Sequence, residues 1–112
     1  MPSTRPDHAR RNDRVLTLHP AGKRGVRIER TKYEAMRRAI LACVPRTKAG
    51  IALADVPPCL RSSLDPSIFG PRTSIAWYLI TVKQDLEARG LIEVVPGARP
   101  QHLRRASRKR AP

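Results

Sequence analysis

Hydrophobic residues alternate with polar ones in two short runs near the start of the chain. The runs are Val15–Leu18 and Val26–Ile28, and such alternation is typical of strands that bury one face. The segment between them contains Pro20, Gly22 and Gly25, residue types that favour turns. The pattern therefore predicts an N-terminal β-hairpin.

Beyond the hairpin, apolar residues recur every three or four positions, which predicts a first amphipathic helix. Thr31 and Glu34 have the spacing of a capping box, in which each side chain accepts a hydrogen bond from a free backbone N–H. Pro45 cannot continue the helical hydrogen bonds and predicts the end of the helix. The predicted buried stripe consists of Tyr33, Met36, Ile40, Cys43 and Val44.

A second, shorter helix is predicted at about residues 56–64, after a short strand at Ile51–Leu53. Asp55 is a suitable N-cap, and the two prolines that follow are tolerated in a first helical turn. The connector that leads to the next helix carries Ile68 and Phe69, which we expect at the edge of the core. The inward residues of the helix itself are predicted to be Val56, Cys59, Leu60 and Leu64.

The third helix has the clearest pattern in the chain. It begins with Thr73 or Ser74 as its cap and ends at Gly90, a residue common just after helices. A strand over residues 91–95, a turn over 96–100 and a return strand over 101–104 follow. The core stripe is predicted to be Ile75, Leu79, Val82 and Leu86, with Tyr78 beside it.

The predicted order from Thr31 onward is helix, strand, helix, helix, strand, turn, strand, which is the order of a winged helix-turn-helix domain. The segment VKQDLEARGLIEVVPG resembles the end of the recognition helix and the wing of many bacterial winged-helix regulators. Together, LHPAGKRGVRIERTKYEAMRRAIL and SIAWYLITVKQDLEARGLIEVVPG resemble a small bacterial winged-helix family of unknown function. The resemblance covers most of residues 15–105 and implies an α+β fold: a winged helix-turn-helix of three helices and a C-terminal wing, with an added N-terminal hairpin. The resemblance supports the fold more than any activity, because winged helices also serve as protein-interaction and structural modules. No catalytic residues carry over.

The charge of the chain points to a polyanionic partner. The 112 residues suffice for one domain, and 23 Lys and Arg residues against 9 Asp and Glu residues give a formal net charge of +14. Such an excess attracts DNA or RNA first and an anionic membrane surface second, although a merely solvated basic surface has the same composition. An aromatic content of 4% disfavours modules that bind single strands by stacking bases on aromatic side chains.

The two ends of the chain differ from its middle. Residues 1–13 are predicted to be a disordered basic arm, residues 14–105 the folded domain, and residues 106–112 a disordered basic tail. No apolar run is long enough to span a bilayer, and the N-terminus lacks the apolar core of a secretory signal. We therefore expect a cytoplasmic protein in which Cys43 and Cys59 are reduced, buried thiols.

The third helix is the candidate for reading DNA. With ~100° per residue, the face opposite its core stripe carries Thr73, Trp77, Ile80, Thr81, Gln84 and Ala88. In a helix-turn-helix this face enters the major groove. Thr73, Thr81 and Gln84 can hydrogen-bond base edges, and Trp77 can contact a thymine methyl or a sugar.

Other interpretations of this face stay open, because Trp77 and Ile80 can equally pack under the N-terminal hairpin or contact a protein partner.

Cations near the helix suit phosphates: Arg72 at its N-terminal end and Lys83 on its flank. The predicted wing carries Arg99, the best single candidate for a phosphate or the minor groove. Behind it lie His102, Arg104 and Arg105, and the tail adds Arg108, Lys109 and Arg110.

An enzyme is not indicated. The three histidines have no metal-ligand spacing, no serine or cysteine lies in a nucleophile motif, and the glycines of the first turn do not complete a phosphate loop. Asp85 and Glu87 are explained by local pairing with Lys83 and Arg89. No cofactor, metal or small-molecule ligand is expected.

The leading hypothesis is a protein that binds double-stranded DNA, such as a bacterial transcriptional regulator or a nucleoid-associated factor. The first alternative is a winged-helix interaction or dimerisation module, which would make the protein a homodimer without sequence-specific DNA binding. The second is an RNA-associated basic protein that binds through its tails.

Overall fold

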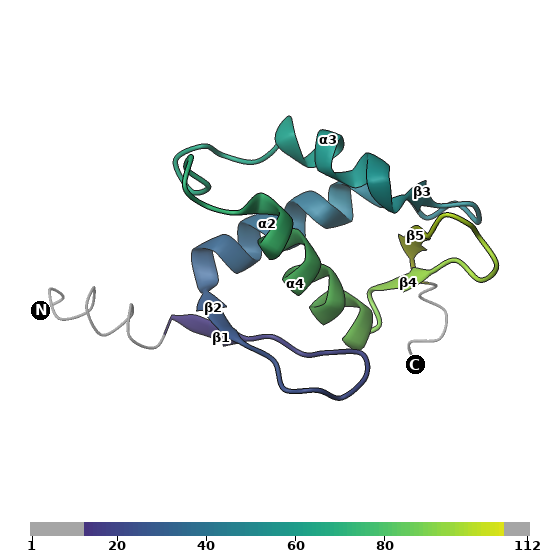
Figure 1. Ribbon diagram of the computed structural model, residues 1–112, viewed down its shortest axis with the longest axis horizontal. Helices are drawn as coiled ribbons and strands as arrows, with labels where there is room; N and C mark the ends of the chain where they lie inside the picture. The colour runs from purple at the N-terminus through teal and green to yellow at the C-terminus, as the bar shows by residue number, and fades with distance from the viewer. Residues whose placement is uncertain (1–12, 107–112) are drawn as a thin grey trace, which may run out of the picture.

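The computed structural model describes residues 13–106 (Figure 1). The predicted basic arm and basic tail lie outside these residues, except for Asp13 and Ala106. Within the described range the chain forms three α-helices, one short 3-10 helix and two small antiparallel sheets. The α+β class is therefore confirmed.

The N-terminal hairpin is present, with a first strand one residue shorter than predicted and a second strand shifted by one residue. Strand β1 (Arg14–Leu16) pairs antiparallel with β2 (Arg27–Glu29), and Val15 lies opposite Ile28. Ile28 is buried, and Val15 packs against the core beside it. The long loop between β1 and β2 extends along the lower edge of Figure 1.

Helix α2 (Arg30–Cys43) follows β2 without a linker. The predicted capping box at Thr31 is wrong, because the helix begins one residue earlier and no side chain caps it. Instead, the Arg30 N–H donates to the backbone carbonyl of Asp13 at 2.9 Å, so the hairpin supplies the missing acceptor. The Glu34 carboxylate lies 3.6 Å from the guanidinium of Arg30.

The segment after α2 forms β3 (Ile51–Ala52), a 3-10 turn (Leu53–Asp55) and α3 (Val56–Arg61). Helix α3 ends three residues before the predicted boundary. The N–H groups of Ser63 and Leu64 both donate to the carbonyl of Leu60 at 2.9 Å, so the chain continues as a turn. Asp55 is the N-cap residue as predicted, although its side chain makes no capping hydrogen bond.

The two cysteines form a disulfide between the end of α2 and α3. Their Cα atoms lie 6.2 Å apart, so the prediction of reduced thiols is wrong. Both Cys43 and Cys59 are half-buried. Their sequence positions gave no sign of the pairing, because it depends on how α3 packs against the last turn of α2.

Helix α4 (Ile75–Ala88) lies across α2 (Figure 1) and presents the predicted core stripe to it. The hydroxyl of Ser74 accepts from the Trp77 N–H at 3.1 Å, which confirms Ser74 as the cap. Gly90, with φ of +77°, ends the helix and lets the Leu91 N–H reach the carbonyl of Leu86 at 2.9 Å.

The chain ends in a second sheet, with strand order β3–β5–β4. Strands β4 (Ile92–Val94) and β5 (His102–Arg105) form an antiparallel hairpin, and β3 pairs with the other edge of β5. Leu103 lies at the centre of this sheet and is fully buried. The sheet and the three helices share one core, which includes Met36, Ile40, Val56, Leu60, Phe69, Val82, Leu86 and Ile92.

Candidate nucleic-acid interface

The face of α4 opposite the core is open to solvent at its N-terminal half. Trp77 is 46% exposed and Ile80 is 47% exposed, so the N-terminal hairpin does not cover either side chain. Thr73, Thr81 and Gln84 are half-buried on the same helix or at its start. The Trp77 ring contacts Tyr78 edge-on, with ring centroids 4.9 Å apart. The part of the predicted face around Trp77 and Ile80 is therefore accessible, while its other residues are half-buried.

The C-terminal end of this face is bordered by the N-terminal hairpin. Ala88 lines a pocket together with residues of the β1–β2 loop. The Leu18 N–H donates to Oδ1 of Asp85 at 2.8 Å and ties that loop to α4. The hairpin is thus a neighbour of the α4 face and leaves the Trp77 end free.

Asp85 is the centre of a buried polar cluster. Its side chain is fully buried and accepts hydrogen bonds from the Leu18 N–H, the Tyr33 hydroxyl and Nε of Arg89. Burial, and then the hydrogen bond to the Asp85 carboxylate, raise the pKa of Tyr33 above its ordinary value. The Asp85 carboxylate likewise raises the pKa of Arg89. This cluster joins the hairpin, α2 and α4.

The local pairing expected for the carboxylates of α4 is confirmed. Arg89 lies 2.8 Å from Asp85, and Lys83 pairs with Glu87. Lys83 was predicted on the flank of the helix as a phosphate contact, but the residue is only 8% exposed and its ammonium group is not free for a phosphate. Lys83 follows Leu79 by one helical turn, which places it next to the buried stripe, where Glu87 balances its charge.

Among the arginines that were predicted to contact DNA, Arg72 and Arg99 have side chains that are free to contact a phosphate. Both are exposed, and neither forms an ion pair among residues 13–106. Arg72 precedes α4, whereas Arg99 lies in the turn between β4 and β5. They therefore lie beyond opposite ends of a helix that is about 21 Å long.

The other wing cations have partners within the fold. Arg104 donates from Nε to Glu93 at 2.6 Å and from a terminal nitrogen to the Lys48 carbonyl at 3.0 Å. Arg105 lies in β5, one residue beyond the predicted return strand, and its Nε donates to the Leu41 carbonyl near the end of α2 at 2.9 Å. Burial, with a smaller contribution from Arg46, lowers the pKa of Arg105. His102 contacts the carbonyl of Pro100 through Nδ1 at 2.8 Å.

One family model matches the amino-acid sequence of this chain. It is DUF6958, described as a family of unknown function, and it matches residues 14–103. The chain belongs to DUF6958. The match runs from β1 into β5, so the N-terminal hairpin is part of the matched unit together with the helices and the second sheet. No curated protein and no solved structure matches the chain.

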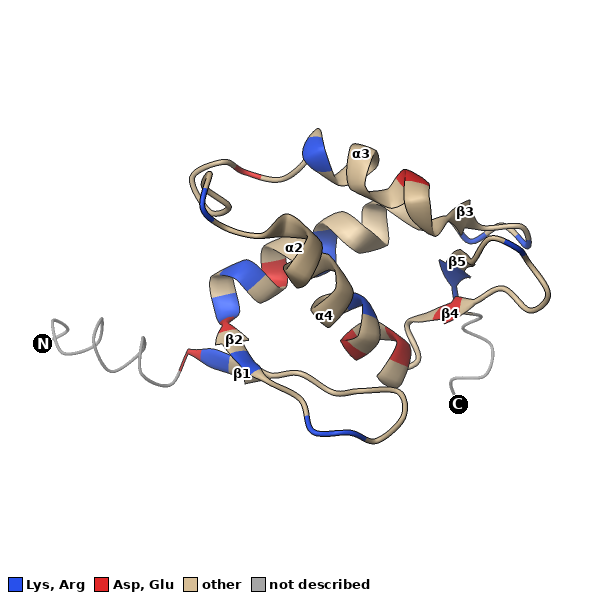
Figure 2. Ribbon diagram, in the orientation of Figure 1, with Lys and Arg blue, Asp and Glu red and all other residues tan. Residues whose placement is uncertain are grey.

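The DUF6958 chain also carries exposed cations in the β1–β2 hairpin that were not predicted as binding residues, two of them in the turn whose glycines do not complete a phosphate loop. Lys23 and Arg24 lie in the β1–β2 loop, with Arg14 and Arg27 on the strands, and all four are exposed. Figure 2 shows this basic stretch along the hairpin, on the same side of the molecule as the C-terminal end of α4. The sequence indicated these cations only as two adjacent basic residues in a predicted hairpin turn. The contact between that turn and α4 could not be predicted from the sequence.

Two further features bear on what this DUF6958 chain can hold. In the part of the chain that the structure describes, no group of three or more His, Cys, Asp and Glu side chains is placed to bind a metal ion. Among the same residues, no helix is both long enough and apolar enough to cross a bilayer.

Proposed function

We propose that the protein is a winged helix-turn-helix that binds double-stranded DNA, with α4 in the major groove and the β4–β5 hairpin as its wing. The arrangement α2–β3–α3–α4–β4–β5 supports this proposal. In a winged helix the recognition helix leads directly into the wing, as α4 leads into β4 here. The sheet order β3–β5–β4, with the short strand β3 on the outside, agrees with the same topology.

The observation that carries the proposal is the open face of α4. Trp77 and Ile80 are almost half exposed, and the polar side chains of Thr81 and Gln84 lie beside them. The major groove admits a helix, and base edges there offer donors, acceptors and the thymine methyl group. A face that mixes apolar side chains with an amide and a hydroxyl can contact both kinds of group.

The charge of the chain fits a duplex partner. The formal net charge is +14, and Arg72 and Arg99 remain exposed at the two ends of α4. Each phosphate that a cation neutralises releases counter-ions, so the proposal requires an affinity that falls as salt rises. Sequence preference would come from the uncharged α4 face and would be modest. This is the profile expected of a regulator or of a nucleoid-associated factor with limited base reading.

Fluorescence anisotropy with a labelled duplex at several salt concentrations tests the proposal. We expect the wild type to bind at roughly 50 mM salt with a linear fall of log affinity against log salt. Arg72→Gln is expected to reduce the magnitude of the slope by about 0.9, the contribution of one phosphate contact to B-DNA. Gln84→Ala is expected to weaken binding by about fivefold to tenfold without changing the slope, because a base-edge contact releases no counter-ions.

Arg38→Gln is the matched control, since Arg38 is an exposed arginine on α2. It is expected to leave the slope nearly unchanged. Titration with a duplex RNA of the same sequence distinguishes DNA binding from the alternative of an RNA-associated protein. The deep, narrow major groove of A-form RNA does not admit a helix, so the proposal predicts weaker binding to the RNA. No binding of duplex DNA at low salt, or equal binding of both duplexes, would overturn the proposal.

A second candidate function is supported by the same exposed pair. Trp77 and Ile80 form an apolar patch, and patches of this kind occur at protein interfaces. Light scattering of the wild type and of Trp77→Ala separates the two functions. If the wild type is a dimer that Trp77→Ala dissociates, while DNA affinity per protomer stays unchanged, the interface function is correct. Val94→Ala, which truncates another exposed apolar residue at 39% exposure, is the control.

A further inference from the structure

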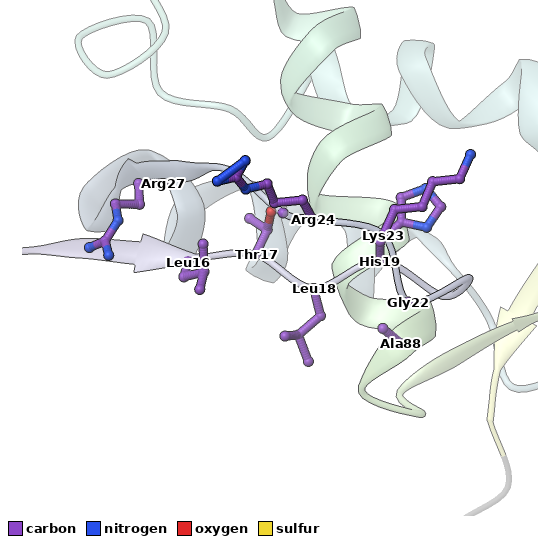
Figure 3. Close-up of a pocket in the computed structure, with 10 residues that line it drawn as sticks. Leu16, Thr17, Leu18, His19, Gly22, Lys23, Arg24, Arg27 and Ala88 are labelled. Carbon is purple, nitrogen blue, oxygen red and sulfur yellow. The ribbon is translucent and has the colours of Figure 1, made fainter.

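A pocket of about 630 Å³ lies between the N-terminal hairpin and the C-terminal end of α4. The hairpin provides most of its lining, and Ala88 provides the contribution of α4. Lys23, Arg24, Arg27 and His19 are among the lining residues, and no carboxylate is (Figure 3). A concave surface with several cations and no balancing acidic group favours an anionic ligand.

The hairpin that carries these cations is held in one position. The Leu18 N–H donates to the buried Asp85 carboxylate, which fixes the first half of the loop to α4. Thr17 is 3% exposed and closes the loop against Val26: its N–H donates to the Val26 carbonyl at 2.9 Å, and its hydroxyl accepts from the Val26 N–H at 3.0 Å. The cations of the loop therefore lie on a segment that is held in place by these two sets of hydrogen bonds.

The base of the loop is also closely packed. A Cβ atom added to Gly25 would lie 1.7 Å from the carbonyl oxygen of Thr17, so the two strands of the loop can approach this closely only with glycine there. At the opposite side of the loop, the space around Gly22 is open: no atom lies within 4 Å of an added Cβ. The loop is thus tight at its base and accessible at its tip.

The tip offers hydrogen-bond donors in addition to charge. The Ala21 N–H donates to Nδ1 of His19 at 3.0 Å, which places the proton of the neutral imidazole on Nε2. Nε2 of His19 is therefore available as a hydrogen-bond donor rather than an acceptor. In Figure 3 the side chains of Lys23 and Arg24 extend away from the side on which Leu18 lies. Cationic and neutral donors of this kind suit the oxygens of a phosphate group.

The pocket lies where a DNA backbone is expected if α4 enters the major groove. Recognition helices contact bases with their N-terminal half. Ala88 follows Trp77 by eleven positions, which is about 16 Å further along the helix and well beyond the half that is expected to contact bases. The Ala88 end therefore leaves the base edges and approaches the phosphates beside the groove.

We propose that the hairpin pocket is a phosphate-binding site for the DNA backbone, with Lys23 and Arg24 as its main contacts. This inference rests on the proposed function and adds a third contact region to α4 and the wing. It also gives the N-terminal hairpin a role: the Asp85 anchor positions its cations relative to the recognition helix. His19 adds a neutral hydrogen bond at the same site.

The experiment compares Lys23→Gln/Arg24→Gln with the wild type in anisotropy titrations of one duplex across a range of salt. We expect the magnitude of the salt slope to fall by about 1.8, because two phosphate contacts at about 0.9 each are lost. The affinity at ~0.1 M salt is expected to fall on the order of tenfold or more. Both residues are exposed, so thermal unfolding is expected to match that of the wild type.

Arg38→Gln/Arg61→Gln is the matched control, since it removes the same charge from exposed positions. Arg61 ends α3, which lies at the opposite edge of the view from the β1–β2 loop in Figure 1. The control is expected to change the slope by less than about 0.5, the effect of net charge alone. If the wild type binds DNA and both double variants have equal slopes, the pocket inference is wrong and the proposed function stands. If the wild type does not bind duplex DNA, both are wrong.

Discussion

Leu18 and Asp85 are separated by 67 positions in the sequence, yet the Leu18 N–H donates to Oδ1 of Asp85 at 2.8 Å. The carboxylate also accepts from the Tyr33 hydroxyl and from Arg89 while being fully buried. One side chain therefore joins the N-terminal hairpin to the helix that we propose to enter DNA. Through this contact, the hairpin belongs to the proposed binding surface.

Asp85→Ala is expected to be strongly destabilising. The substitution leaves the Leu18 N–H and the Tyr33 hydroxyl without an acceptor, and it removes the partner of Arg89. The expected loss in the free energy of unfolding is on the order of 3 kcal/mol. Urea denaturation measures it. Glu34→Ala, which removes an exposed carboxylate 3.6 Å from Arg30, is expected to cost less than about 1 kcal/mol. Equal costs for the two variants would show that the Asp85 cluster contributes little.

Tyr33 gives the protein a pH dependence on the alkaline side. Its pKa is raised in the folded state, so the folded protein holds the phenol proton more tightly than the unfolded chain does. This contribution to stability is complete below the ordinary pKa of 10.0 and is lost as pH rises from there through the folded pKa. Tyr33→Phe should cost about 1–3 kcal/mol at neutral pH.

Urea unfolding of wild type and Tyr33→Phe at increasing pH checks this expectation. The difference in stability between the two proteins is expected to shrink once the pH exceeds about 10. Tyr78 is present in both proteins, so its titration cancels in the comparison. A difference that grows with pH would mean that the folded state favours the ionised form of Tyr33.

Gly25→Ala is expected to disturb the hairpin. The added Cβ would lie 1.7 Å from the Thr17 carbonyl oxygen, which forces the strands of the loop apart. We expect a loss of about 1–3 kcal/mol, the usual cost of overpacking. Gly70→Ala is the control, because no atom lies within 4 Å of its added Cβ. Thermal unfolding of both variants measures the difference, and similar melting temperatures would contradict the close contact at Gly25.

The disulfide between Cys43 and Cys59 is expected to stabilise the junction of α2 and α3. A bridge that spans 16 positions should contribute about 3 kcal/mol, mainly by restricting the unfolded chain. Adding dithiothreitol is therefore expected to lower the melting temperature of the wild type. Cys43→Ala/Cys59→Ala is expected to melt at one temperature with or without the reductant. An unchanged wild-type melting temperature would indicate free thiols.

The features that sequence predicted correctly are those that local chemistry determines. Ser74 caps α4 because its hydroxyl reaches a backbone N–H three residues on, and Gly90 ends the helix because it tolerates positive φ. The buried stripe of α4 follows from helical periodicity alone. The predicted end of α2 before Pro45 is correct for the same kind of reason.

The features that sequence missed depend on contacts between distant segments. The capping box at Thr31 was plausible locally, but Asp13 supplies the acceptor to the helix start instead. Lys83 was predicted as a phosphate contact on the flank of α4, and its burial could not be predicted without knowing which segments cover that turn of the helix. Arg105 was predicted as a DNA-contacting cation behind the wing, although its guanidinium binds the Leu41 carbonyl 64 positions away. The same limit hid the disulfide and the role of Asp85.

Trp77 is the single tryptophan of the chain and lies on the α4 face that we propose to enter the major groove. Its emission therefore reports directly on the central claim. Titration of the protein with duplex DNA at low salt is predicted to give a saturable change in Trp77 fluorescence, with the same midpoint as anisotropy of a labelled duplex. Trp77→Phe should bind the duplex with no such signal. Duplex binding seen by anisotropy with no change in Trp77 emission, or no binding by either method, would contradict the account.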